Sequence, residues 1–508
     1  MASAPGATSY CDLGGAELSP EAASIVIFGA TGDLARRKIV PALYNLRLSG
    51  LLPEGTRIVG FARREQGEGE FRASLREACE RYSHTRPVDD DAWDWLERRI
   101  TYLRGDLDDG AAYERLASLL SAPLMPDNAL FYLAVAPDQF EVVARNLGAA
   151  GLGGAMKGGG VRPSPPGFRR LVVEKPFGRD RSSARALNRA LQERFDERDI
   201  FRIDHYLGKE TVQNLLYFRF ANSIFEPLWN SSHVQSIEID VLETGGIGAR
   251  GGYYDKAGAA RDMLQNHLVQ LLCLTAMEPP ASLDAESVRD EKVKVLRSIR
   301  DYPREELLGR SRRGQYAAGV LADGSPCAAY RDEPKVAPGS STETYVSLRL
   351  EVDDWRFAGV PFTLRTGKAL DRQSSEIRVR FRRPPATLFS DYCGDALSPN
   401  ALAIRIQPDE GMALRFNAKV PGAARLGSSE MRFAYREAND AYFPEAYERL
   451  LADALSGDST LFIRADEAEE SWRIIDALEA AWEGGPPPEP YAAGSSGPAG
   501  DGPEAWGL

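Results

Sequence analysis

The chain has 508 residues, of which 43% are hydrophobic and 27% charged, and its formal net charge is −12. These proportions are those of a globular protein with room for two to four domains. The acidic balance argues against general nucleic-acid binding, and no apolar run approaches the roughly 18 residues of a membrane span.

The cysteines are scattered and show no CxxC spacing; they are Cys11, Cys79, Cys273, Cys327 and Cys393. An odd number without paired spacing favours free thiols in a reducing compartment over a disulfide framework or a zinc site. The first basic residue is Arg36, so the N-terminus lacks the charged region of a secretory signal. We therefore expect a cytoplasmic protein whose residues 1–23 form a flexible segment.

From Ile25 onward, short apolar runs alternate with longer helical patterns, which predicts βαβ units and a parallel sheet. The expected strands are Ile25–Phe28, Arg57–Ala62, Ile100–Leu103, Ala129–Val135 and Leu171–Glu174. Gly151–Phe168 is rich in Gly and Pro and predicts a flexible surface loop. We assign residues 24–200 to a dinucleotide-binding domain with a Rossmann-like, doubly wound parallel sheet.

The first expected strand leads into Gly29-Ala30-Thr31-Gly32-Asp33-Leu34, a tight turn followed by a helix start. Glycine lets the backbone approach a pyrophosphate, and the amides at the helix N-terminus hold it. The middle glycine of the usual GxGxxG fingerprint is absent, so the position after an apolar strand supports the assignment. Pro41 should kink or interrupt the helix that follows.

The ends of the later strands supply further candidate residues. The second strand ends in Arg63-Arg64, where NAD-selective proteins place an acid. A basic side chain there can accommodate the extra phosphate of NADP, so Arg63 is the expected specificity residue; an ordinary surface arginine pair is the alternative. Asp106 and Leu107 follow the third strand on the expected adenine side. Glu174-Lys175-Pro176 closes the fifth strand, at the edge where ligands bind and where a cis proline could fix the turn.

Beyond about residue 200, strands with two-residue alternation lack regular helical crossovers, which predicts a mainly antiparallel sheet. The expected strands are Ser236–Leu242, Thr344–Val352, Glu376–Phe381, Ala401–Gln407 and Met412–Ala418, and the expected helices are Arg261–Met277, Pro444–Leu455 and Ala465–Trp482. We assign residues 201–483 to a larger α+β domain for substrate binding and oligomerisation. Residues 484–508 are rich in Pro, Gly and Ser and predict a disordered tail.

The run Arg202–Glu210 (RIDHYLGKE) places a carboxylate, an imidazole, a phenol and an ammonium close together. If the run is helical, His205, Tyr206 and Lys209 share a face, while Asp204 turns toward another element. Two cations and a hydroxyl suit a phosphate monoester, which offers three acceptor oxygens. A solvated helix face with ion pairs is the alternative interpretation.

A second candidate is His267, which lies on the apolar stripe of a helical pattern in Arg261–Leu271. A lone histidine on such a stripe is usually a core residue. Here, however, the run around Asp204 closely resembles the signature of glucose-6-phosphate dehydrogenases, and Arg261–Leu271 matches the catalytic helix of that family. The resemblance extends from about Ile25 to about Trp482.

The resemblance implies oxidation of glucose 6-phosphate at its anomeric carbon by NADP, giving 6-phosphogluconolactone in the first step of the oxidative pentose phosphate pathway. It makes His267 the general base and Asp204 the carboxylate that holds its tautomer. An imidazole suits this role because its unperturbed pKa is about 6.5. Hydride transfer is the chemistry of the cofactor, so no metal is expected, and NAD is a second candidate cofactor.

The resemblance also implies the remaining contacts. The expected substrate contacts are Lys175, His205, Tyr206, Lys209, Glu243, Asp262 and Lys368, with His205, Tyr206 and Lys209 on the phosphate. The expected cofactor contacts are Gly29, Ala30, Thr31, Gly32, Asp33, Leu34, Arg63, Asp106, Leu107, Tyr132 and Lys175. Relatives often have a basic residue where this chain has Gln373, and Arg372 is one place early, which leaves a second basic substrate contact open.

Two other functions are consistent with parts of this pattern. A related oxidoreductase could act on an unphosphorylated sugar, although Lys209 and His205 would then lack a charged partner. A non-catalytic dinucleotide-binding regulator would not need both Asp204 and His267. We favour the phosphate-specific enzyme and expect it to form a homodimer or homotetramer.

Overall fold

The computed structural model describes residues 20–154, 167–384, 389, 398–435 and 444–501. The chain divides into two compact units. The first contains residues 1–135, 146–172 and 447–458, and the second contains residues 136–145, 173–446 and 459–508. These units cross the expected domain boundary at residue 200, because residues 173–200 belong to the second unit.

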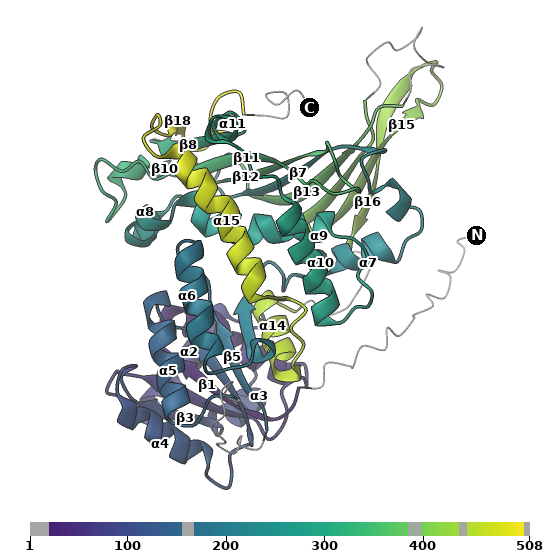
Figure 1. Cartoon of the computed structure of the whole chain (residues 1–508). Helices are drawn as coiled ribbons and strands as arrows, with labels where there is room; N and C mark the ends of the chain where they lie inside the picture. Colours follow the sequence, from purple (N-terminus) through teal and green to yellow (C-terminus); the bar gives the residue numbers. More distant parts are fainter. Residues whose placement is uncertain (1–19, 155–166, 385–388, 390–397, 436–443, 502–508) are drawn as a thin grey trace, which may run out of the picture. The chain divides into compact units, whose positions relative to one another are not determined.

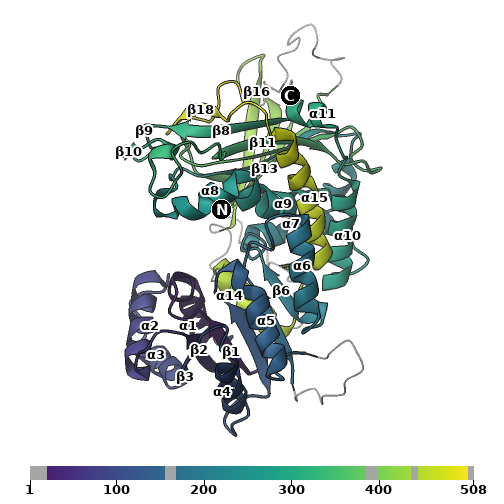
Figure 2. The ribbon, with the colours of Figure 1, turned by 60° about the vertical axis from the view of Figure 1, so that its left-hand side comes forward.

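The first unit is built on a parallel sheet whose strands run in the order β5-β4-β1-β2-β3. The strands are β1 (Ala23–Phe28), β2 (Arg57–Ala62), β3 (Ile100–Arg104), β4 (Asn128–Leu133) and β5 (Arg169–Val173). The helices between them include α1 (Val40–Leu48), α2 (Glu68–Tyr82), α3 (Asp90–Glu97) and α4 (Gly110–Leu120), with α1–α3 on one side of β1–β3 and α4 on the other (Figures 1 and 2). All five predicted strands are present. Every residue of β1 is buried, as expected for a parallel strand covered on both faces.

Pro41 does not interrupt its helix, because Ile39 and Val40 keep helical φ and ψ, but the winding of the helix widens just before the proline. Residues Ala35–Ile39 form a π-helical turn, and α1 then begins with Pro41 as its second residue. Proline has no N–H to donate to the carbonyl four residues earlier, and its ring crowds that carbonyl. A wider turn before the proline relieves both conflicts.

The second unit contains a nine-stranded sheet in the order β16-β15-β14-β13-β7-β12-β11-β8-β18. Its strands are β7 (Val234–Leu242), β8 (Ser311–Ala317), β11 (Tyr345–Glu351), β12 (Pro361–Gly367), β13 (Ser374–Phe381), β14 (Ala401–Gln407), β15 (Gly411–Lys419), β16 (Leu426–Ala434) and β18 (Glu489–Ala492). Two neighbouring pairs, β7–β12 and β8–β18, are parallel and the others are antiparallel. The predicted fold class is therefore confirmed.

Helices of the second unit pack against one another and, through a π-helical segment, against the nine-stranded sheet. They include α6 (Arg181–Gln192), α7 (Glu210–Phe220), α8 (Gly251–Ala259), α9 (Val269–Ala276), α10 (Ala285–Ser298), α11 (Arg304–Gly309) and α15 (Ala465–Trp482). The long α15, yellow in Figure 1, packs against α6, α10, α11 and a π-helical segment, η6 (Ala260–Leu268). In turn, η6 contacts the central strands β7 and β12.

The prediction of a disordered tail is wrong for residues 484–501. Here β18 pairs with the edge strand β8, and the buried Tyr491 donates a hydrogen bond of 2.7 Å to the carbonyl of Lys368. Composition alone misses this segment because its order comes from long-range strand pairing. Residues 502–508, residues 1–19 and most of the Gly/Pro-rich loop (155–166) lie outside the described residues.

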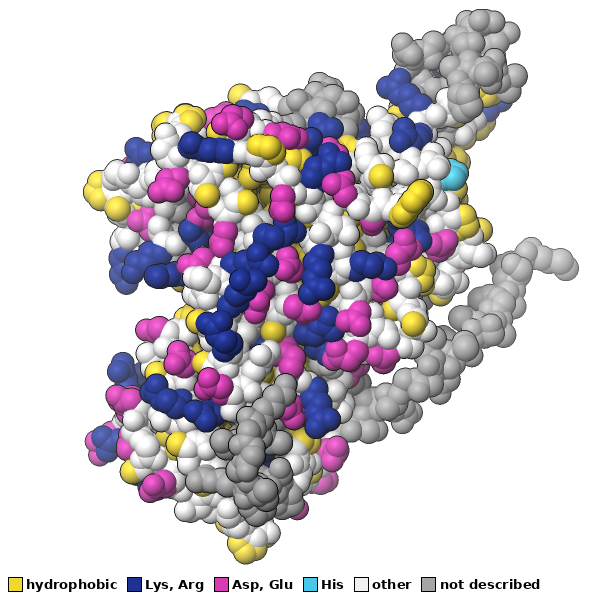
Figure 3. Space-filling view, in the orientation of Figure 1, with side chains coloured by type: hydrophobic (Ala, Val, Ile, Leu, Met, Phe, Trp, Pro, Cys, Tyr) yellow, Lys and Arg dark blue, Asp and Glu magenta, His cyan; other side chains and the backbone are white. Residues whose placement is uncertain are grey.

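On the face shown in Figure 3, acidic and basic side chains are interspersed. Within the described ranges, no helix is long and apolar enough to cross a membrane. Three cysteines fall in those ranges, Cys79, Cys273 and Cys327, and all three are free thiols.

Candidate functional site

The carboxyl ends of four parallel strands meet at one edge of the first unit. The backbone N–H of Gly29, after β1, donates to Phe61 of β2 at 2.9 Å. The N–H of Gly105, after β3, donates to Ala62 at 3.0 Å, and that of Ala134, after β4, donates to Phe28 at 3.0 Å. In an open α/β sheet, such an edge is where nucleotides bind.

The turn after β1 requires glycine at its first position. Gly29 has φ = +81°, and a Cβ there would lie 2.3 Å from the carbonyl oxygen of Ala134. The chain turns sharply, because Gly32 N–H donates to Gly29 O at 2.8 Å, and becomes helical at Asp33. The structure thus confirms the predicted strand, turn and helix start.

The other predicted cofactor residues differ in exposure. Arg63 is exposed immediately after β2, and Asp106 is exposed after β3 and accepts a hydrogen bond from Leu107 N at 2.8 Å. Tyr132 is fully buried within β4. Arg63 thus places an exposed guanidinium at the strand end where NAD-selective proteins place an acid.

The run around Asp204 is not helical, contrary to the interpretation that placed His205, Tyr206 and Lys209 on one helix face. Ile200–Ile203 forms strand β6, the next residues turn, and α7 begins after Lys209. The Asp204 carboxylate closes the turn by accepting from Tyr206 N at 2.9 Å, an arrangement for which aspartate is well suited. The Lys209 ammonium still lies over the Tyr206 ring, 3.9 Å from its centre.

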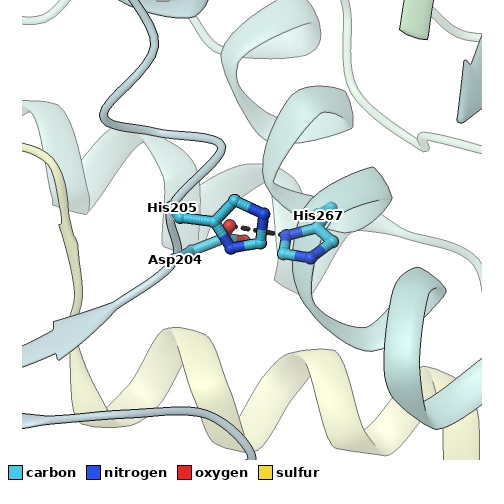
Figure 4. Close-up of side chains that lie close together, drawn as sticks. All are labelled: Asp204, His205 and His267. Carbon is cyan, nitrogen blue, oxygen red and sulfur yellow. Dashed lines mark hydrogen bonds and ion pairs between the residues drawn. The ribbon is translucent and has the colours of Figure 1, made fainter. Parts of the chain in front are cut away.

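Asp204 and His267 form a buried pair (Figure 4). Nδ1 of His267 and Oδ1 of Asp204 are 2.5 Å apart, and both side chains are almost fully buried. Burial alone would raise the pKa of the Asp204 carboxyl, but the charge and hydrogen bond of His267 outweigh it and hold that pKa well below its usual range. Asp204 therefore remains an anion beside the imidazole.

Lys175 determines which nitrogen of His267 carries the proton. Its Nζ lies 3.0 Å from His267 Nε2, and an ammonium can only donate. Nε2 is therefore the acceptor, and Nδ1–H donates to Asp204. Burial lowers the pKa of His267, Asp204 opposes this shift, and Lys175 adds to it, so that the pKa lies below 6.5. The imidazole is consequently a neutral base at neutral pH, with its lone pair on Nε2.

Asp262 lies beside His267 and Lys175 because of the π-helical geometry of η6. The Lys175 ammonium donates to the Asp262 carbonyl at 2.9 Å and lies 3.4 Å from its Oδ1. A π-helix bonds residues five apart, and Asp262 and His267 have that separation. In an α-helix, side chains five apart would point about 140° away from each other. The sequence pattern predicted an ordinary helix here and missed this feature.

Glu243 and Lys368 meet because their strands end together. β7 and β12 are adjacent and parallel, with Leu242 opposite Gly367 at their carboxyl ends. The next residue of each strand is a partner in the Glu243–Lys368 ion pair. Burial lowers the pKa of Lys368 to about 7 and Lys175 adds to this shift, whereas the ion pair itself favours the ammonium. These two groups can offer a polyhydroxylated ligand both an acceptor and a donor.

The expected phosphate-binding residues lie beside the base. The His205 ring is 4.6 Å from the His267 ring, and the Tyr206 ring is stacked on His267 at 4.3 Å. Burial, then the charges of His267 and Lys175, lower the pKa of His205 well below 6.5, so His205 is a neutral donor and not a cation. Burial lowers the pKa of Lys209 only to about 8, so Lys209 carries the positive charge at neutral pH.

Asp204, His205 and His267 also offer three ligand atoms within 4.8 Å of one another. Two ligands of a tetrahedral zinc ion, at about 2.0–2.2 Å from the metal, stand more than 3 Å apart. The 2.5 Å between Asp204 and His267 is instead the separation of a charge-assisted hydrogen bond. The geometry of this pair therefore fits proton transfer.

Sequence reasoning missed two supporting residues, Ser375 and Tyr253. The Tyr206 hydroxyl lies 3.1 Å from Ser375 Oγ, and the Tyr253 hydroxyl donates to Asp262 Oδ1 at 3.4 Å. Both contacts join segments distant in sequence or on different turns, and no local pattern indicates them. Arg372 is exposed and lines a separate pocket of about 260 Å³ with Arg365 and Arg378.

Comparisons with known proteins agree with this geometry. Residues 26–214 match the model of the glucose-6-phosphate dehydrogenase NAD binding domain, and residues 216–502 match the C-terminal domain of the same family. The chain belongs to the glucose-6-phosphate dehydrogenase family. The resemblance noted in the sequence is therefore confirmed, and the chain is an oxidoreductase by family.

Relatives of this family cover nearly the whole chain. Glucose-6-phosphate 1-dehydrogenase 2 of Mycobacterium tuberculosis is 45% identical over 479 residues, which is 93% of this chain and 91% of that protein. The enzyme of Bacillus subtilis is 42% identical over 484 residues, or 94% and 95% of the two chains.

Solved structures give the same result. A glucose-6-phosphate dehydrogenase in complex with its substrate glucose-6-phosphate superposes with a TM-score of 0.85 and 37% identity, over 95% of this chain and 96% of that one. The Mycobacterium avium enzyme has a TM-score of 0.80 and 36% identity, over 94% and 96%.

The electrostatics of His267 lead to a prediction for Asp204→Asn. Activity should rise with pH through the pKa of His267, because the neutral imidazole is the active form. Since Asp204 raises that pKa, its neutralisation should shift the acid limb of kcat/KM to lower pH and reduce kcat at least about tenfold. The pH–rate profiles of the two proteins in the family reaction, recorded with the same substrate, give the shift directly. An acid limb that stays in place or moves to higher pH would show that Asp204 does not tune His267.

Proposed function

We propose that the chain oxidises glucose 6-phosphate to 6-phosphogluconolactone with NADP, the first step of the oxidative pentose phosphate pathway. The observation that carries this proposal is the buried Asp204–His267 pair, whose geometry leaves His267 Nε2 as a hydrogen-bond acceptor. A histidine with a lone pair at that atom and an anion behind it is equipped to remove a proton. The family, and the substrate bound in a relative of the same fold, support the choice of reaction.

In the proposed mechanism, His267 Nε2 accepts the proton of the anomeric hydroxyl while the anomeric carbon loses a hydride and its C–O bond becomes the lactone carbonyl. Bound NADP would supply the hydride acceptor. Asp204 stabilises the imidazolium that forms. Lys175 occupies Nε2 in this structure, so the substrate hydroxyl takes over that position and Lys175 then donates to the sugar oxygen.

The phosphate is proposed to bind to His205, Tyr206 and Lys209. Ser375 can donate to the Tyr206 oxygen, which leaves the phenolic hydrogen free to point at a phosphate oxygen. Glu243, Asp262 and Lys368 are proposed to bind sugar hydroxyls. A regulator without catalytic activity would have no use for the Asp204–His267 pair.

We infer that Gly29, Ala30, Thr31, Gly32, Asp33 and Leu34 hold the pyrophosphate of the cofactor, with Asp106, Leu107 and Tyr132 on the same strand edge and Arg63 on the extra phosphate. We also infer a cytoplasmic homodimer or homotetramer. The exposed side chains of Tyr217, Met431 and Phe433 line an apolar pocket on α7 and β16, which supports association between copies. Light scattering after size exclusion would reveal a monomer if this inference is wrong.

The direct test is nicotinamide reduction with glucose 6-phosphate, with free glucose and with NAD run in parallel. We expect strong preference for the phosphorylated sugar, and His267→Asn should lower kcat at least about 10²-fold with little change in cofactor affinity. Equal turnover of free glucose would favour an oxidoreductase of unphosphorylated sugars. Near wild-type kcat in the variant would remove His267 from the role of base.

Lys209→Ala should act on substrate affinity. A charge-assisted hydrogen bond to phosphate is worth about 1.5–3 kcal/mol, so the apparent KM for glucose 6-phosphate should rise about tenfold to hundredfold. The exposed Lys294→Ala is a matched control that should behave like the wild type. If Lys209→Ala raised the apparent KM for free glucose in the same proportion, Lys209 would not recognise the phosphate.

Arg63→Ala should change the apparent KM for NADP more than that for NAD. A guanidinium pairs with the extra phosphate of NADP but finds no anion on the ribose of NAD. The apparent KM for NADP should therefore rise about tenfold or more, and that for NAD should change much less. Arg98→Ala, at an exposed arginine of the same unit, is the control. An equal effect on both cofactors, or on neither, would move the assignment to Arg64.

A further inference from the structure

The π-helix η6, which carries the candidate base His267, begins at a kink that separates it from α8. Near the end of α8 (Gly251–Ala259), Gly258 has a φ of 70° and a ψ of 175°, which are not helical, and η6 then starts at Ala260. The first N–H groups of a new helix have no partners within it. Buried N–H groups at such a position must find acceptors elsewhere in the fold.

Glu343 supplies those acceptors from the segment that precedes β11. Its carboxylate oxygen Oε1 accepts from Ala260 N at 3.0 Å, and its backbone carbonyl accepts from Ala259 N at 3.1 Å. Glu343 is buried, and burial raises its pKa. A single residue thus caps two successive N–H groups at the start of the helix.

The glycine at the kink lets the carboxylate approach this closely. A Cβ on Gly258 would lie 2.2 Å from Glu343 Oε1, and the positive φ also disfavours any other residue. The two residues therefore fit each other across 85 positions of sequence. Such a fit specifies where the helix begins.

The side shared by Asp262 and His267 is the one that Lys175 contacts. If the start of η6 relaxed into α-helical winding, these two side chains would diverge by about 140°. Lys175 could then no longer contact both, and His267 Nε2 would turn from its position. The start of the helix is therefore linked to the direction of the base.

We propose that Glu343 is a positioning residue for the reaction: by accepting the hydrogen bond of Ala260, it holds η6 in the π-helical form that directs Asp262 and His267 toward the same substrate. This inference rests on the proposed role of His267. Glu343 acts through the helix and does not touch the substrate.

Three substitutions separate the hydrogen bond from charge and bulk. Glu343→Gln keeps the length of the side chain and an oxygen acceptor, so kcat should remain within about threefold of the wild type. Glu343→Asp keeps the charge but is one methylene short, and Glu343→Ala removes the acceptor; both should lower kcat about tenfold or more, the effect of one lost hydrogen bond on a reacting geometry. The apparent KM for glucose 6-phosphate should rise less than kcat falls, because Asp262 is one of several proposed sugar contacts and the phosphate contacts Tyr206 and Lys209 come from another segment.

The assay uses the full-length protein with NADP, and thermal melting shows whether each variant is folded. Wild-type kcat in both Glu343→Asp and Glu343→Ala would overturn the inference, as would a Gln variant that falls as far as the Ala variant. A rise in KM that matches the fall in kcat would indicate general damage and would also overturn it. If Glu343→Ala does not fold, the comparison of Gln with Asp decides the question. His267→Asn is run alongside: if it stays active, the proposed base fails, whatever the Glu343 variants show.

Discussion

The hydrogen bond between Asp204 and His267 is the interaction on which the site depends. A buried carboxylate is costly unless it is paired. Here its partner is the imidazole of His267, which in turn needs a neighbouring anion to stabilise its protonated form. The bond joins the turn after β6 to η6, so it also fixes two segments that are far apart in sequence. Removing either partner would deprive the other of its charge-assisted hydrogen bond in a buried position and leave only the contacts with Tyr206 N and Lys175 Nζ.

The remaining charged groups are placed by strand ends. Lys175 follows β5, Asp204 follows β6, Glu243 follows β7 and Lys368 follows β12. A strand buried in a sheet fixes the position of the residue after it more firmly than a loop could. The substrate site is thus built from short extensions of rigid elements, which keeps two lysines and two carboxylates in place without requiring a long ordered loop.

Much of the fold and of the candidate site could be predicted from the sequence, and the features that could not be predicted share physical causes. The five parallel strands, the glycine turn at Gly29 and a disturbance of the helix near Pro41 were predictable because each follows from a local pattern. The run around Asp204 was given the wrong local structure, since an aspartate turn and a helix place similar residues close together. The π-helical winding of η6, the Ser375 contact and the Glu343 cap depend on residues far away in sequence. The order of residues 484–501 was missed for the same reason, because composition does not reveal pairing with β8.

The contact between Tyr491 and the carbonyl of Lys368 makes the site depend on a segment that is synthesised long after Lys368 itself. Lys368 is made more than a hundred residues before the phenol that holds its backbone. The carbonyl of Lys368 therefore gains this hydrogen bond only when β18 has left the ribosome and paired with β8. Chains released before that point would lack this hydrogen bond and carry an unpaired β8 edge, and such an exposed edge is a feature by which the cell's proteases would distinguish them from the folded protein.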